Sequence, residues 1–193
     1  LVLLCAFSET RLMMTDNAKT TITVFRIAGD IEPDTKSVQD AQQYAITRIN
    51  ADDTLLKDYE LKLKVLNSGN SDEKALQHAI TMSVCNGSVS SIVSPIVLGC
   101  PFSAFSVLTS KVFNIFHLLQ ISATATGSDL SNKNNYKSFF RTVADDRVMA
   151  LRLVRFCKQN GWTRVGVVYQ DDAWGRDLDT AIEEEAEREG VTV

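Results

Sequence analysis

The sequence predicts an α/β fold in which a parallel sheet carries helices on both faces. Two observations predict it: short apolar, β-branched runs alternate with longer segments of helical periodicity, and polar side chains gather where predicted strands end. Strands that alternate with helices form parallel sheets through right-handed crossovers. Ligands of such sheets bind at the carboxyl ends of the strands, so the polar residues between Ile121 and Gly175 indicate a small-molecule site.

The predicted strands are short runs of β-branched and apolar residues bounded by turn residues. The first, Thr20–Ala28, reads TTITVFRIA. Tyr59–Leu66 alternates apolar and charged residues, which is typical of an outer strand. Further strands are expected at Ser90–Leu98, Phe116–Ser122, Phe139–Val143 and Arg164–Tyr169. We expect Pro95 and Gly99 to end the strand that begins at Ser90.

The predicted helices have apolar residues three and four positions apart. They are expected at Ser37–Asn50, Glu73–Val84, Ser103–Asn114, Asp146–Asn160 and Trp174–Glu189. Gly161 and Gly190 provide C-terminal stops for the last two. Two core-facing stripes are expected, one of Val38, Ala41, Ala45 and Ile49, the other of Met149, Leu153, Phe156 and Cys157.

Composition and missing motifs exclude several classes of function. A net charge of −4 offers no basic face for nucleic acid. The two histidines, His78 and His117, have no carboxylate or cysteine at ligand spacing. The sequence has no G-x-G-x-x-G after the first strand, no G-x-x-x-x-G-K-[ST] and no G-x-S-x-G. We therefore expect no enzyme activity, no cofactor and no metal site.

The first residues and the cysteines are typical of a secreted protein. LVLLCAF at Leu1–Phe7 is too short to span a bilayer and is interpreted as the end of a signal peptide, with a buried strand or a chain end as the alternative. A bridge between Cys85 and Cys100 would join a helix end to a strand end, whereas Cys157 is expected to be a buried free thiol. Asn86-Gly87-Ser88 is a glycosylation sequon.

With these residues in view, the chain resembles the ligand-binding ectodomains of class C G-protein-coupled receptors, of the metabotropic glutamate and GABA-B type. The resemblance runs from about Thr20 to Val193 and is carried by four segments: RINADDTLL at Arg48–Leu56, SATA at Ser122–Ala125, DLSNKNNYKSFFRTVADD at Asp129–Asp146, and W-T-x-V followed by DDAWG at Trp162–Gly175. It implies a type I periplasmic-binding-protein-like fold, the two-lobed Venus flytrap. Natriuretic-peptide receptors and bacterial leucine-binding proteins belong to the same wider group.

The resemblance divides the chain into three parts and implies a ligand site between two lobes. Residues 20–143 are then expected to form lobe one and residues 144–193 to begin lobe two, after the leader that the N-terminal residues 1–19 indicate. The family's ligand-contacting acid falls on Asp146, and its aromatic residue falls on Trp174, where the family usually has tyrosine. Its Ser-Ala-Thr turn falls on Ser122 and Thr124. A hydroxyl, a carboxylate and an indole face together suit an ammonium group.

The sequence departs from the family at the serine that holds an amino acid's carboxylate. In the family, serines open a helix whose N-terminus attracts an anion. Here Pro101 and Phe102 follow Gly99-Cys100, so Ser103 is the candidate and Ser106 stands behind it. The loop 125–128 is also longer than in the glutamate receptors, and both differences argue against glutamate. GABA-B-like receptors have a disulfide in the corresponding place, which favours the pair Cys85 and Cys100.

The resemblance thus implies the extracellular ligand-binding region of a plasma-membrane receptor that binds an amino acid or amine and signals by lobe closure. Its expected partners are a second ectodomain, joined through lobe one, and a downstream transmembrane module with its G protein. Three alternatives stay open. They are a periplasmic-type solute-binding protein for amino acids, the ectodomain of a natriuretic-peptide-type receptor guanylate cyclase, and an enzyme or a lobe without a ligand site.

Overall fold

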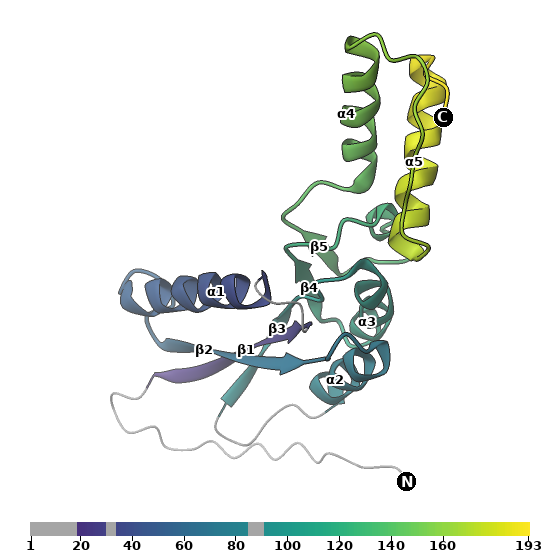
Figure 1. Ribbon diagram of the computed structural model, residues 1–193. Coiled ribbons are helices and arrows are strands. Elements are labelled where there is room, and N and C mark those ends of the chain that lie inside the picture. The colour runs from purple at the N-terminus through teal and green to yellow at the C-terminus, as the bar shows by residue number, and fades with distance from the viewer. Residues whose placement is uncertain (1–18, 30–33, 85–90) are drawn as a thin grey trace.

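The computed structural model describes residues 19–29, 34–84 and 91–193, and a parallel sheet of five strands lies at its centre (Figure 1). The sheet order is β2-β1-β3-β4-β5, and every neighbouring pair is parallel. The strands are β1 (Thr20–Ala28), β2 (Tyr59–Asn67), β3 (Ser91–Leu98), β4 (Leu119–Ser122) and β5 (Phe139–Arg141). The predicted α/β class is confirmed.

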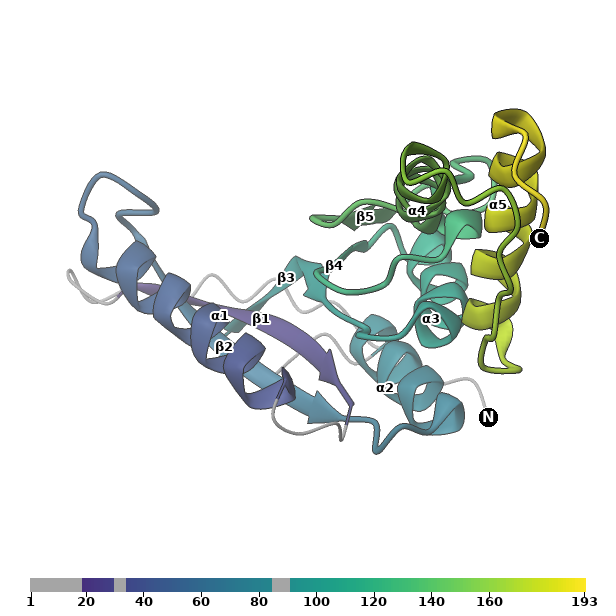
Figure 2. The same cartoon turned by 45° about the horizontal axis from the view of Figure 1, so that its top comes forward.

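Helices lie on both faces of this sheet. They are α1 (Asp34–Ala51), α2 (Asp72–Val84), α3 (Ser103–Ile115), α4 (Asp146–Gln159) and α5 (Ala173–Glu189), and a 3-10 turn, η1 (Ser128–Ser131), follows β4. Helix α1 covers one face, while α2 and α3 pack on the other (Figures 1 and 2). Helices α4 and α5 lie side by side beyond β5. The main core therefore lies between the sheet and α2 and α3.

Alternation along β1 places neighbouring side chains on opposite faces of the sheet. Ile27 is fully buried and packs with Val97 of β3 and Phe113 of α3 in the main core. Arg26, one residue earlier, is buried on the side of α1. A buried arginine within an apolar strand needs polar partners, and Arg26 lines a pocket between β1 and α1.

Helix α1 buries a face that is rotated from the predicted one and keeps only Val38 and Ile49 of the predicted stripe, both half-buried. Ala41 and Ala45 are exposed, whereas Ile46 is buried. The isoleucine side chain removes far more apolar area from water than a methyl group does, so it turns toward the sheet. Asn50 fixes the end of the helix on β2, since its side chain donates to the carbonyl of Leu61 at 2.9 Å and accepts from the amide of Leu61 at 2.9 Å.

The predicted stripe of α4 is also wrong. Met149, Leu153 and Phe156 are exposed, with Phe156 the most open at 55%. The helix instead packs against α5 through small residues that allow close approach: Ala150 and Val154 meet Ala181, Ile182 and Ala186. Cys157 is a partly buried free thiol. The helix pair is also joined by Glu189, which accepts from Arg155 at 2.9 Å and Lys158 at 2.8 Å.

Two strand predictions need correction. Arg164–Tyr169 forms only an isolated parallel bridge, between Arg164 and Thr192, because the three-residue segment Val191–Val193 is its only backbone partner among the described residues. Val168 is 100% exposed, which no strand inside a sheet would be. Pro95 does not end β3 but lies where the register with β1 shifts, and the strand continues to Leu98.

Cys100 is a buried free thiol in the structure, and the part of the chain that the structure describes contains no disulfide partner for it. Its sulfur lies 3.5 Å from the Thr109 hydroxyl within the main core. Burial raises the pKa of the Cys100 thiol to about 12, an effect that the hydrogen bond to Thr109 partly opposes. Cys5, Cys85 and Asn86 lie outside the described residues, so the pairing and the glycosylation stay predictions.

We expect Cys100 to resist iodoacetamide at pH 8 in the folded protein, because a fully buried thiol with a pKa of about 12 has almost no reactive thiolate there. It should be alkylated after unfolding in urea without reductant. Peptide mapping by mass spectrometry measures both states. Alkylation only after reduction would contradict the free thiol and establish a disulfide of Cys100.

Candidate functional site

A cleft of about 820 Å³ lies where the first turn of α3 faces the start of α5. It is formed at the carboxyl ends of β3 and β4, because the loops that follow these strands supply much of its lining. Three of the five predicted ligand residues line it: Ser103, Thr124 and Trp174. The structure thus brings together residues that are up to 71 positions apart in the sequence, 174 − 103 = 71.

The N-terminus of α3 presents backbone donors to this cleft. Phe102 occupies the N-cap position and makes no side-chain capping hydrogen bond. The first amides of a helix have no partner within it, and they attract anions together with the helix dipole. Ser103 begins the helix, and its hydroxyl accepts from the amide of Gly127 at 3.0 Å. This end of the cleft suits a carboxylate.

Ser122 and Ser106 do not line the cleft but hold together the loops that form it. Both side chains are fully buried, and both hydroxyls donate to the carbonyl of Cys100, at 2.7 Å and 3.1 Å. The Ser122 oxygen also accepts from the amides of Thr124 and Ala125. These bonds fix the loop after β4 against the loop after β3. Thr124 adds to this by donating to the carbonyl of Pro101 at 2.7 Å, although its side chain lines the cleft.

The opposite wall is formed by Trp174, in the first turn of α5. Its indole is 39% exposed, and its Nε1 donates to the Thr126 hydroxyl at 3.2 Å. Asp172 caps the helix by accepting from the amide of Gly175 at 2.7 Å, which sets the direction of the tryptophan. Sequence reasoning had not singled out Asp172, although an aspartate three residues before that glycine, at the start of a helix, is a recognisable capping signal.

Asp146 lies behind this wall rather than on the surface of the cleft. It is fully buried at the start of α4, and its amide donates to the Thr126 carbonyl at 3.0 Å. Among the described residues neither carboxylate oxygen has a partner at hydrogen-bond distance and angle, although the Thr126 hydroxyl and the Trp174 indole lie near enough to favour the charged form. Such a group is costly in a protein interior unless a cation or donor reaches it.

Burial raises the pKa of the Asp146 carboxyl above its usual range, and the neighbouring Asp177 carboxylate raises it further. The Thr126 hydroxyl, the Trp174 indole and the Arg141 guanidinium act in the opposite direction. Asp177 itself accepts from the amide of Ser128 at 2.6 Å and so holds α5 against η1. The carboxylate is therefore placed where a positive group would be stabilised.

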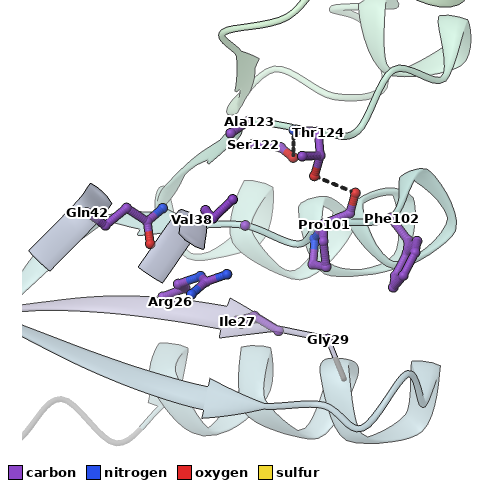
Figure 3. A pocket seen from close by; sticks show the side chains of 11 residues that line it. Arg26, Ile27, Gly29, Val38, Gln42, Pro101, Phe102, Ser122, Ala123 and Thr124 are labelled. Carbon is purple, nitrogen blue, oxygen red and sulfur yellow. Dashed lines mark hydrogen bonds between the residues drawn. The ribbon is translucent and has the colours of Figure 1, made fainter. Parts of the chain in front are cut away.

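A second pocket, of about 140 Å³, branches from the cleft on the side of α1 (Figure 3). It shares Pro101, Phe102 and Thr124 with the cleft. Arg26 and Gln42 lie at its far end, away from Phe102. Sequence reasoning missed both, because Arg26 stands inside an apolar strand and Gln42 lies beside the stripe assigned to α1.

A family model described as the receptor family ligand binding region matches residues 37–193. The chain belongs to this family. The match includes α1 from Ser37 onward and everything after it, and so contains most of the residues that form the cleft and the second pocket. The predicted relationship to class C receptor ectodomains is confirmed.

Several receptors are similar over most of the chain. The probable metabotropic glutamate receptor mgl-1 of Caenorhabditis elegans is 27% identical over 174 residues, which is 80% of this chain and 17% of that receptor. The human extracellular calcium-sensing receptor is 27% identical over 165 residues, 79% of this chain and 15% of that receptor. The chain thus spans about a sixth of the length of these relatives.

The fold is also that of a bacterial binding protein. An ABC transporter substrate-binding protein from Desulfitobacterium hafniense superposes with a TM-score of 0.75 at 22% identity, over 90% of this chain and 49% of that one. The predicted periplasmic-binding-protein-like fold is therefore confirmed, and the relatives found are receptors and binding proteins. Among the helices described here, none combines the length and the hydropathy needed to cross a membrane.

Proposed function

We propose that this chain binds a small amino acid, or a related amine, in the cleft between α3 and α5, as part of an extracellular receptor. In this proposal residues 20–143 form lobe one and residues 144–193 begin lobe two. The observation that carries it is the pairing of two charged environments. The open N-terminus of α3 lies on one side of the cleft, and the buried, unpartnered carboxylate of Asp146 stands behind the other.

The two environments suit the two ends of a zwitterion. The carboxylate of an amino acid would accept from the first amides of α3 and from Ser103. Its ammonium group would contact Thr124 and the face of Trp174 and would be stabilised by Asp146. Trp174 is held to Thr126 by one hydrogen bond, so a small movement of the indole gives the ammonium group access to the carboxylate. An amino acid bound in one solved structure of the same fold, a complex with Leu, supports this class of ligand.

Lobe closure would then carry the signal. The lobe-one loops bind the ligand first, and the start of α5 swings against it and brings Trp174 into contact. The similar sequences belong to receptors, which favours a receptor over a transporter-linked solute-binding protein. The proposal includes a second ectodomain joined through lobe one, a transmembrane module and a G protein at the plasma membrane.

A thermal-shift screen of the complete ligand-binding region that contains this chain tests the proposal. We expect at least one amino acid or amine to raise the melting temperature, with a gain of about 2.7 kcal/mol in unfolding free energy at a hundredfold excess over its Kd. Simple carboxylic acids without an amine serve as controls and should give smaller shifts. The absence of a shift with every amino acid and amine would overturn the proposed function.

A further inference from the structure

The pocket that branches toward α1 has a polar end made by two side chains that the ligand-binding proposal does not use. Arg26 comes from the middle of β1 and is only 4% exposed. Gln42 comes from α1, and its side-chain oxygen is buried with no hydrogen-bond partner among the described residues. A buried acceptor that lacks a donor is uncommon in folded proteins and indicates a position that a ligand completes.

The pocket adjoins the cleft. Pro101, Phe102 and Thr124 line both spaces, so the side chain of a ligand held at α3 would lie next to the pocket. A volume of about 140 Å³ is enough for a polar group larger than one water molecule. Ile27, Val38 and Phe102 provide apolar walls between the cleft and the polar end.

We propose that this pocket selects the side chain of the ligand and that it favours a carboxamide end, as in glutamine. This inference rests on the proposed function, since it assumes an amino acid in the cleft. The carboxamide oxygen would accept from the Arg26 guanidinium, and its amide nitrogen would donate to the Gln42 oxygen.

Other side chains satisfy fewer of these groups. A carboxylate could accept from Arg26 but brings no donor to the Gln42 oxygen. An apolar side chain such as that of methionine leaves both protein groups without a ligand partner. Sites built around hydrogen-bonding groups reject analogues that lack the matching group, and here the buried Gln42 oxygen would then stay without a donor. Burial lowers the pKa of Arg26, which agrees with a weakly solvated guanidinium at this end.

Isothermal titration of the complete ligand-binding region with glutamine, glutamate and methionine tests the proposal. Glutamine should bind roughly tenfold or more tightly than the other two. A preference for glutamate or methionine, or equal affinity for all three, would overturn the inference while leaving the proposed function intact. Failure of every amino acid to bind would overturn both.

Two variants identify the residues responsible. Gln42→Leu removes the acceptor, and Arg26→Lys keeps the charge but loses the forked donors. Both should reduce the ratio of glutamine to methionine affinity at least fivefold. Gln43→Leu and Arg48→Lys change the same residue types on the exposed surface of α1 and should leave the ratio unchanged. A ratio that persists in folded Gln42→Leu protein would show that the pocket does not select the ligand.

Discussion

Replacing Asp146 by asparagine should weaken the binding of an amine ligand by about 30-fold or more. Loss of one charge from a buried pair typically costs at least ~2 kcal/mol, and asparagine keeps the shape of the side chain while removing its charge. Isothermal titration with the ligand found by thermal shift measures the effect. Asp58→Asn, an exposed change in the loop before β2, is the matched control and should bind normally. If Asp146→Asn bound the ligand as tightly as wild type, the Asp146 carboxylate would not be part of the ligand site.

The same variant should become more stable when no ligand is added. Because burial raises the folded-state pKa of Asp146, the native protein binds the proton more tightly than the unfolded chain does. Wild-type stability therefore falls as pH rises from the unfolded pKa of about 3.9 through the higher folded pKa. Asparagine does not ionise, so the variant lacks this dependence of stability on pH. We expect Asp146→Asn to melt at a higher temperature than wild type at pH 7, with the difference shrinking toward pH 4.

Strands and helices could be predicted from this sequence because their signals are local. The β-branched run of β1 has the predicted bounds, Thr20–Ala28. The buried face of each helix was harder to predict, because the element that packs against the helix decides which face is buried. In α4 the bulky Met149 and Phe156 form the visible apolar pattern, yet Ala150 and Val154 allow α5 to approach closely and are the residues buried. Residues 164–169 could form a strand only beside a second strand, and the local sequence pattern does not show whether such a partner is present.

Some residues of the candidate site could likewise be predicted from local sequence, whereas others depend on contacts between distant segments. Ser103, Thr124 and Trp174 line the cleft because they follow strand ends or begin helices, and their role as ligand contacts stays a prediction. Ser122 has the same signal and lines the second pocket, but its hydroxyl donates to the carbonyl of Cys100, 22 residues earlier in the sequence. Arg26 was missed because only the stacking of α1 over β1 reveals that this strand position faces a pocket.

Gly175→Ala should cost about 2–4 kcal/mol of unfolding free energy. A Cβ atom at this position would lie 1.9 Å from the carbonyl oxygen of Gln170 and 3.0 Å from its carbonyl carbon. These are backbone atoms, so the strain cannot be relieved by rotating a side chain. The chain must shift instead, which also weakens the Asp172 cap of α5 and displaces Trp174 from the cleft.

Urea denaturation measures the stability of Gly175→Ala, and titration with ligand should show weaker binding in parallel, because the clash lies in the segment that positions the cleft wall. Gly166→Ala is the matched control. A Cβ at Gly166 has no neighbour within 4 Å, so this change should alter stability by less than about 1 kcal/mol and leave ligand affinity unchanged. If Gly175→Ala were as stable as Gly166→Ala, the turn from Gln170 into α5 would follow a different path, and Trp174 would not be held where the proposed ammonium site requires it.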